Sequence, residues 1–234
     1  MKKPKRNKTA NSRIDPFDKN AAAYDRWYDE NPEVLALELS TVRFLLDQAK
    51  EDYRTKGCRH EIQGLEVGVG TGRFGMALGI RTGIDPAPAM LEMASSRGME
   101  VFAGVAENLP FEDGQFDYTA FFTSICFLED PLNAFLEANR VTRKGGFLIC
   151  SFLNRDSGMG RQLADHKEKD LFYCGATFFS GAEVLRLLEM AGYHSFSVRE
   201  AVFMEPTASR EHEGGLGHGL YGVVLAWKKE EGMK

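Results

Sequence analysis

The chain has 234 residues, of which 43% are hydrophobic and 27% are charged, and its formal net charge is −5 at pH 7. This size and composition are typical of a soluble protein with one large α/β domain, and the negative charge gives no overall attraction to DNA or to an anionic membrane. No apolar run approaches the roughly 18 residues that a membrane span needs, so we expect no membrane partner.

The cysteines and histidines form neither a disulfide framework nor a metal pattern. The four cysteines are widely spaced and include no C-x-x-C pair, which favours reduced thiols in a cytoplasmic protein. His212 and His218 flank a glycine-rich loop at a spacing typical of no metal site. We therefore predict that no metal is bound.

The N-terminal part is expected to contain a tail and a helical segment. Residues 1–16 are basic, and we predict a disordered tail there. The segment 17–50 has a helical pattern, in which Tyr24, Trp27 and Tyr28 share one face before a break at Asn31.

Strands and helices alternate in the rest of the chain. Asp130 is expected to cap one helix, and Ser180 with Glu183 forms a capping box for another. The predicted strands are 65–67, 81–85, 99–104, 116–125, 147–153, 193–204 and 221–229, and the predicted helices are 72–78, one ending at residue 94, 131–141 and 182–191. This order predicts an α/β fold with a doubly wound, Rossmann-like sheet of seven mostly parallel strands, closed by an antiparallel C-terminal hairpin.

The stretch LEVGVGTGRF, residues 65–74, supports two interpretations. Residues 70–75 form G-x-G-x-x-G, the pattern of a dinucleotide-binding loop, whereas Glu66 begins an overlapping E-x-G-x-G-x-G. Asp85 lies nineteen positions after Glu66 at the end of the second strand, where a carboxylate accepts both hydroxyls of a ribose. Because both candidate cofactors contain adenosine, Asp85 does not discriminate between them.

Three features argue against a nicotinamide cofactor. The Glu66 carboxylate would repel a pyrophosphate but attract a ligand ammonium group. The loop lies behind some sixty residues of helix and linker, whereas nucleotide dehydrogenases often open with it. The segment AENLPFEDGQFDYTAFF, residues 106–122, follows the third strand and leads into the fourth.

The ordered motifs LEVGVGTGRF, GIDPAPAML, AENLPFEDGQFDYTAFF and EANRVTRKGGFLI make the chain resemble the class I S-adenosylmethionine-dependent methyltransferases. It is similar to their small-molecule branch, which includes the ubiquinone/menaquinone-biosynthesis type. The resemblance runs from about Phe17 to Ile149.

The resemblance implies a role for each matching residue. The glycine-loop backbone would pack on the methionine part of the cofactor, and Glu66 would hold its amino group directly or through water. Asp85 would bind the ribose hydroxyls, and Thr123 would lie below the sulfonium. The implied cofactor-binding residues are Glu66, Gly68, Gly70, Gly72, Asp85, Met90, Ala106, Glu107 and Thr123.

Some residues depart from the family pattern or allow a second interpretation. Val105 stands where the family commonly has an aspartate, so an adenine contact there would come from backbone or water. Met90 is the weakest of the cofactor assignments, because a methionine on an apolar helix face is more often plain core. Cys126 and Cys174 invite comparison with methyltransferases that bind arsenite through thiols, although buried inert thiols are the stronger interpretation.

The fold leaves its cofactor open above the strand ends, and methyl transfer benefits when water is excluded. We therefore predict that the segment 17–50 acts as a helical lid, mobile over 17–28, and that 155–179 is a substrate-side insertion. The candidate substrate or lid residues are Tyr24, Trp27, Tyr28, Phe127 and Tyr173.

The expected reaction is in-line methyl transfer from S-adenosylmethionine to a small-molecule acceptor, which leaves S-adenosylhomocysteine. No residue is identified as a general base. The alternatives are a nicotinamide-dependent oxidoreductase, a non-catalytic nucleoside-binding protein, and an RNA methyltransferase that uses the basic tail. A DNA amino-methylating enzyme would carry N/D-P-P-Y where this chain has TSICFLEDP, so we expect no DNA partner.

Overall fold

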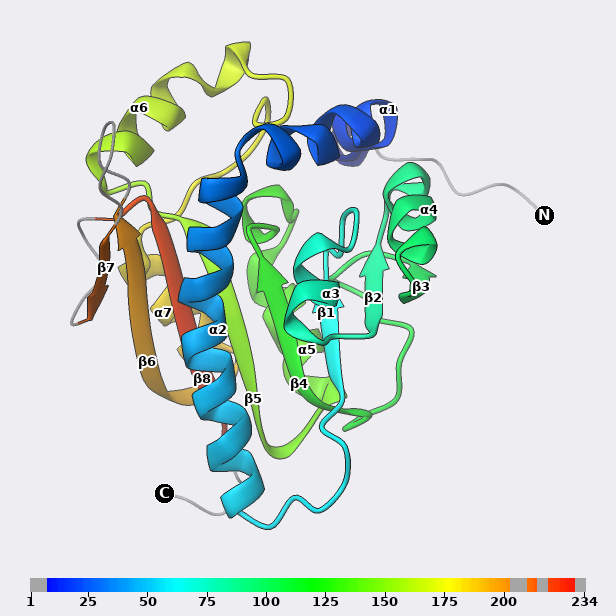
Figure 1. The fold of residues 1–234 in the computed structure, drawn as a ribbon, viewed down its shortest axis with the longest axis vertical. Helices are drawn as coiled ribbons and strands as arrows, with labels where there is room; N and C mark the ends of the chain where they lie inside the picture. The colour runs from blue at the N-terminus through cyan, green and yellow to red at the C-terminus, as the bar shows by residue number, and fades with distance from the viewer. Residues whose placement is uncertain (1–7, 203–209, 214–218, 230–234) are drawn as a thin grey trace.

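Helices and strands alternate along most of the chain (Figure 1). The computed structural model describes residues 8–202, 210–213 and 219–229. The described helices are α1 (Lys8–Glu30), α2 (Pro32–Thr55), α3 (Arg73–Leu78), α4 (Pro88–Ser96), α5 (Pro131–Val141), α6 (Gly158–His166) and α7 (Gly181–Met190), with 3-10 turns η1 (Ile125–Phe127) and η2 (Lys167–Lys169). The described strands are β1 (Gly64–Val67), β2 (Thr82–Asp85), β3 (Glu100–Ala103), β4 (Phe116–Phe122), β5 (Thr142–Leu153), β6 (Tyr193–Val202), β7 (Arg210–Glu213) and β8 (Tyr221–Lys228).

The described strands form one sheet in the order β3-β2-β1-β4-β5-β8-β6-β7. The first five strands in this order pair in parallel, and β8 lies antiparallel between β5 and β6. The predicted Rossmann-like sheet with an antiparallel C-terminal hairpin is confirmed. The structure adds β7, an edge strand paired with β6 inside a stretch that the sequence predicted to be a loop. Its sequence, REHE, has no apolar alternation, so no period-2 signal marked it.

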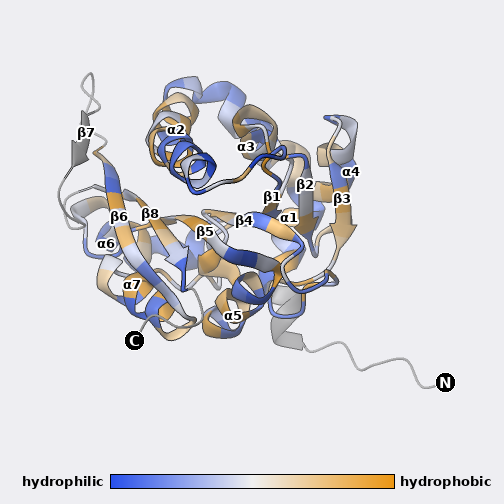
Figure 2. Ribbon diagram, turned by 90° about the horizontal axis from the view of Figure 1, so that it is seen from below, coloured by the Kyte–Doolittle hydropathy of each residue, from blue (hydrophilic) through white to orange (hydrophobic). Residues whose placement is uncertain are grey.

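Helices cover both faces of the sheet (Figure 2). α2 and α3 lie on one face, and α5 and α7 lie on the other. All seven residues of β4 are buried, as expected for a central parallel strand between two helical layers. The carboxyl ends of the parallel strands point toward α1, which crosses that end of the sheet (Figure 1).

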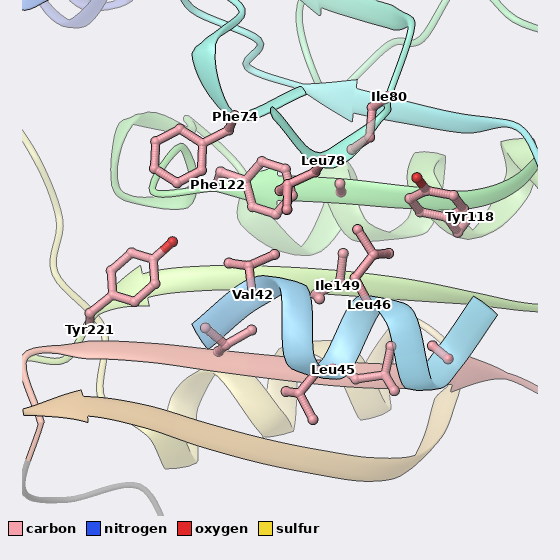
Figure 3. Packing of buried hydrophobic residues seen from close by; sticks show 14 of the residues in the cluster. Val42, Leu45, Leu46, Phe74, Leu78, Ile80, Tyr118, Phe122, Ile149 and Tyr221 are labelled. Carbon is pink, nitrogen blue, oxygen red and sulfur yellow. The ribbon is translucent and has the colours of Figure 1, made fainter. Parts of the chain in front are cut away.

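α2 is part of the core rather than a cover. Val42, Leu45 and Leu46 of α2 point toward the sheet, where they meet residues such as Phe122 and Ile149 (Figure 3). Burying each such side chain contributes about 1.5–3 kcal/mol. The predicted lid of residues 17–50 is therefore divided in the structure, since only α1 lies over the strand ends.

The start of α1 differs from the sequence prediction. The helix begins at Lys8, inside the segment 1–16 that was expected to be disordered, and residues 1–7 lie outside the described residues. The Arg13 guanidinium donates a hydrogen bond to the Leu128 carbonyl, and Ile14 packs against the cluster around Met90. These contacts join residues far apart in the chain, so local composition did not reveal them.

The predicted helix caps are confirmed. The Asp130 carboxylate accepts from the Asn133 N–H at 3.1 Å, and Ser180 with Glu183 forms the expected capping box at the start of α7. Each cap satisfies backbone N–H groups that have no partner inside the helix. The last part of the predicted strand 193–204 and His218 lie outside the described residues, and His212 lies on β7.

Candidate functional site

A cavity of about 350 Å³ lies at the carboxyl ends of β1, β2 and β4. Residues of α1 form its cover, and the loops after the three strands form its floor. The predicted site residues that line it are Tyr24, Gly68, Gly70, Asp85, Met90, Ala106, Glu107, Thr123 and Phe127. Glu66, Gly72, Trp27, Tyr28 and Tyr173 do not line it.

The loop after β1 turns sharply because its glycines adopt left-handed conformations. Gly68 has φ +76, and a Cβ there would lie 2.5 Å from the Ser124 Cβ. Gly70 has φ +51 and faces the cavity, where a Cβ would have no protein neighbour within 4 Å. The loop therefore presents bare backbone to the cavity, as close binding of a ligand requires.

Asp85 ends β2 and lines the cavity with its carboxylate. Oδ2 accepts from the Gly70 N–H and Oδ1 accepts from the Ala87 N–H, both at 2.9 Å. Burial raises the pKa of Asp85 to about 6, although these two hydrogen bonds act to lower it. Since an ionised carboxylate offers about four acceptor positions, the group retains capacity for two ligand hydroxyls.

Glu66 lies beneath the glycine loop rather than in the cavity wall. Its side chain is buried, and Oε2 has no hydrogen-bond partner among the described residues. Burial raises the pKa of Glu66 well above its usual value, the Gly75 amide opposes the shift, and nearby Asp85 adds to it. A Cβ at Gly75 would lie 2.3 Å from Glu66 Oε2, so the last glycine of the G-x-G-x-x-G pattern makes room for this carboxyl group.

Thr123 follows β4 in a strained conformation at the cavity wall. Its φ of 55 is left-handed, which is unfavourable for a β-branched residue and costs of order 1–3 kcal/mol. Its N–H donates to the Ser151 carbonyl at 3.1 Å, whereas its buried Oγ1 has no hydrogen-bond partner among the described residues. The Thr123 side chain also acts to lower the pKa of Tyr221, so its hydroxyl lies beside the Tyr221 phenol as well as at the cavity wall.

The remaining floor residues have mixed roles. Met90 lines the cavity and also packs with α1 residues, so it is part of the core, and its contact with the cofactor stays a prediction. The Glu107 carboxylate accepts from the Glu129 N–H (2.9 Å) and the Asp130 N–H (3.2 Å), so it orders the loop before α5. Val105 is exposed at the cavity rim.

The aromatic candidates separate into three positions. Tyr24 and Phe127 line the cavity, whereas Tyr28 and Tyr173 pack behind them. Phe127 stacks on Tyr173 with ring centroids 6.0 Å apart, and Tyr24 meets Tyr28 edge-on at 5.7 Å. Trp27 is 45% exposed and is not among the residues that line the cavity.

α1 is anchored to the glycine loop and to α4 through Asp25. The Asp25 carboxylate accepts from Arg73 Nε (2.7 Å), Thr71 Oγ1 (2.7 Å) and an Arg97 guanidinium nitrogen (2.6 Å). Burial acts to raise the pKa of Asp25, but the hydrogen bonds from these three side chains outweigh it and hold the pKa at about 2. No motif marked Asp25, because its partners are brought to it only by the fold.

The sequence also gave no sign that Glu38 belongs near the site. This α2 residue is buried, and its nearest hydrogen-bond donor is the Tyr28 hydroxyl at 3.5 Å. It lies within an otherwise apolar helical stripe, where hydrophobic periodicity is the only local signal.

The described cysteines and histidines lie in different surroundings. Cys126 is buried, and burial raises the pKa of its thiol to about 12, whereas Cys174 is exposed beside Glu168. Cys58, His60 and Asp117 lie close enough together to hold an ion. The Arg143 guanidinium occupies that role, since one nitrogen lies 2.7 Å from Asp117 Oδ1 and 2.8 Å from His60 Nε2.

Known proteins share both the sequence and the fold of this chain. Residues 65–150 match a family model described as a methyltransferase domain. An uncharacterised protein of Methanocaldococcus jannaschii is 35% identical over 208 residues, which are 89% of this chain and 95% of the relative. The demethylmenaquinone methyltransferase of Staphylococcus aureus is 31% identical over 181 residues, covering 64% of this chain and 75% of the relative.

A solved structure extends the similarity to the whole fold. The crystal structure of a SAM-dependent methyltransferase of Thermotoga maritima, described as a possible histamine N-methyltransferase, has a TM-score of 0.81 and 36% identity. The match covers 92% of this chain and 99% of that chain. The Rossmann-like sheet and its glycine-loop cavity are thus those of a methyltransferase. The chain belongs to the class I S-adenosylmethionine-dependent methyltransferases, and S-adenosylmethionine is its cofactor.

Family membership decides the cofactor and the enzyme class among the predicted alternatives, whereas the RNA methyltransferase differs from the small-molecule enzyme only in its acceptor. The E-x-G-x-G-x-G interpretation of the loop is correct, and the nicotinamide-dependent oxidoreductase and the non-catalytic nucleoside-binding protein are set aside. No helix among the described residues is long and apolar enough to cross a membrane.

Proposed function

We propose that this enzyme transfers the methyl group of S-adenosylmethionine to a small-molecule acceptor by in-line displacement, with S-adenosylhomocysteine as the product. The observation that carries the proposal is the cavity at the strand ends. There the glycine-loop backbone, the Asp85 carboxylate with free acceptor positions and the buried Thr123 hydroxyl lie together. The names of two relatives refer to small molecules, demethylmenaquinone and histamine, and this supports the same class of acceptor.

The residues of the cavity fit the cofactor from end to end. Gly68 and Gly70 would contact its methionine part, and Asp85 would accept the ribose hydroxyls. Ala106 and Glu107 would lie at the adenine edge, and Thr123 would face the sulfonium. The cofactor supplies an electrophilic methyl group, and alignment by the protein can contribute roughly 7–11 kcal/mol to lowering the barrier.

Glu66 would act on the cofactor amino group from beneath the loop, through water rather than by direct contact. Its buried, unpartnered Oε2 and its position outside the cavity wall favour this arrangement. Gly72 would contribute to cofactor binding indirectly. It is the N-cap of α3 in a left-handed conformation, and this conformation fixes the end of the glycine loop.

We also propose that α1 is a lid whose residues 17–28 become ordered when cofactor or acceptor binds. Tyr24 and Phe17 cover the cavity, and Phe172 of the 155–179 segment contacts both rings at centroid distances of 5.4 Å. Helix α1 and the 155–179 segment are thus in contact beside the cavity. Hydrogen exchange of α1 with and without S-adenosylhomocysteine tests the lid, and high, identical protection in both states would instead make α1 a fixed brace.

Calorimetry tests the cofactor assignment directly. S-adenosylmethionine and S-adenosylhomocysteine should bind in the micromolar range, and saturation at about 100 times Kd should add about 2.7 kcal/mol to the free energy of unfolding. Binding of NAD without binding of S-adenosylmethionine would refute the proposal. Pooled metabolites with a methyl-labelled cofactor should then yield a labelled small molecule.

A further inference from the structure

Glu38 is a buried carboxyl group that the protein does not pair. Its side chain is 6% exposed, and its hydrogen bond from Tyr28 is long, at 3.5 Å. No lysine, arginine or histidine of the described chain forms an ion pair with it. A carboxyl group in such a position destabilises the empty protein, so its presence calls for a role other than packing.

Four tyrosines from several elements belong to or pack against one buried cluster on this side of the sheet, and the hydroxyl of one of them, Tyr28, reaches Glu38. Tyr24 and Tyr28 come from α1, Tyr173 comes from the 155–179 segment, and Tyr221 comes from β8. Burial raises the pKa of each of these phenols, and the Glu38 carboxylate raises it further in all four. The groups that face Glu38 are therefore neutral, and none of them supplies positive charge.

The Glu38 cluster adjoins the cofactor cavity at two points. Tyr24 belongs to both the cluster and the cavity wall. Tyr221 projects from β8 toward the α2 side of the sheet (Figure 3), and its hydroxyl donates to Ser151 Oγ at 2.8 Å. Ser151 Oγ in turn accepts from the N–H of Thr123, which lines the cavity, at 3.2 Å. The cluster thus lies behind the wall that faces the methyl group in the proposed function.

We propose that Glu38 and its four tyrosines form the acceptor subsite, and that this subsite binds a small molecule carrying a protonated amine. This inference rests on the proposed function and specifies its acceptor. A carboxylate supplies the charge that an ammonium group needs, and tyrosine rings add cation–π attraction and hydroxyl acceptors. An anionic acceptor would be repelled by the ionised carboxylate, and a neutral quinone gains no charge pairing from this group, so the cluster favours a cationic acceptor over both.

The proposal also predicts a change in bound protons on amine binding, which can be measured without any enzyme turnover. Burial raises the pKa of Glu38 to about 8, while the Tyr28 hydroxyl acts to lower it. In the ligand-free protein at pH 7 the carboxyl group therefore holds a proton, and an arriving ammonium group displaces it. Amine binding should release a proton at pH 7, and amine affinity should rise as pH rises through about 8, because alkyl ammonium groups stay charged up to about pH 10.

The test titrates the full chain, saturated with S-adenosylhomocysteine, with probes of matched shape and different charge. We expect phenethylamine and n-butylamine to bind more tightly than 2-phenylethanol and n-butanol, and phenylacetate not to bind. Glu38→Gln should weaken the amines roughly 10- to 100-fold, the range for one charge-assisted hydrogen bond, and leave the alcohols unchanged. Calorimetry in phosphate and Tris buffers measures the released proton, which the variant should no longer release.

A matched control variant and the binding of S-adenosylhomocysteine itself keep the outcomes distinct. Glu33→Gln alters an exposed carboxylate on the same helix and should behave like the wild-type protein. Equal affinity for amines and alcohols, an amine preference that survives Glu38→Gln, or no binding of any probe to the loaded protein would each overturn the inference while leaving the proposed function intact. Failure of S-adenosylhomocysteine itself to bind would refute the proposed function, and the inference with it.

Discussion

The cofactor side and the acceptor side of this site are built in different ways. On the cofactor side, the polar contacts come from backbone N–H groups and from acids at the ends of neighbouring strands, all within residues 66–123. On the proposed acceptor side, Glu38 of α2 lies against Tyr28 of α1, and tyrosines of β8 and the 155–179 segment pack in the same cluster as Tyr28. The first arrangement tolerates few changes because the backbone itself forms the site, whereas the second can be altered one side chain at a time. In the proposed function, the first side therefore holds the cofactor and the second sets selectivity for the acceptor.

The largest effect is expected from Asp85→Ala, which removes the acceptor of two ribose hydrogen bonds. At roughly 1.5–3 kcal/mol for each hydrogen bond to a charged group, affinity for S-adenosylhomocysteine should fall by about two to four orders of magnitude. The fold should persist, as checked by thermal unfolding. Asp47→Ala, at an exposed position on α2, serves as the control, and equal affinity in both variants would show that Asp85 is only a strand-end residue.

The anchoring of α1 should be the next most sensitive feature. Asp25→Ala leaves Arg73 and Arg97 without their shared carboxylate and should weaken docking of α1 by about 1–3 kcal/mol. Hydrogen exchange of residues 17–30 should accelerate, and methyl transfer should fall more than cofactor affinity.

Asp29→Ala is the matched control for this anchor. Asp29 also pairs with Arg73, at 2.7 Å, but its side chain is 62% exposed, so the pair contributes little. If both variants exchange alike, the buried Asp25 network is not what holds α1 over the cavity.

The pH dependence of cofactor binding should follow Asp85. The ionised carboxylate accepts the ribose hydroxyls, and its pKa in the free protein is about 6. Affinity for S-adenosylhomocysteine should be constant above this pH and should fall by up to about tenfold per unit below it. Asp85→Asn should bind S-adenosylhomocysteine weakly at every pH, without the fall in affinity below pH 6. A fall of the same size in that variant would assign the titration to another group.

The smallest expected effect is a gain in stability from Glu38→Gln. Burial raises the pKa of Glu38 from 4.5 to about 8, so the native state binds more protons than the unfolded state between these values. The free energy of unfolding of the wild-type protein should therefore fall as pH rises through this window. At pH 9 the variant should melt higher by several degrees, at about 2–4 °C per kcal/mol for a chain of this size, and the difference should shrink at pH 5.

The control for this measurement is again Glu33→Gln, whose melting temperature should track that of the wild-type protein at both pH values. A pH-independent gain in Glu38→Gln would mean that side-chain packing, and not charge burial, sets its stability.

The sequence alone determined the sheet, its hairpin and the cofactor side of the cavity. Those features depend on short-range signals: apolar runs, caps such as Asp130, glycines where the backbone turns, and an acid at the end of β2. Chain neighbours make these contacts, so spacing is enough to place them.

Only the tertiary structure decided which side chains complete the site. It brought Arg13 and Ile14 from a segment expected to be disordered onto the cavity and left Trp27 outside the cavity lining. It also placed Glu38 among tyrosines up to 183 positions further along the chain. Such groupings arise from the packing of α1 and α2 against the finished sheet, and no local pattern encodes them, because a buried acid on an apolar helix face acquires its meaning from neighbours that the fold alone supplies.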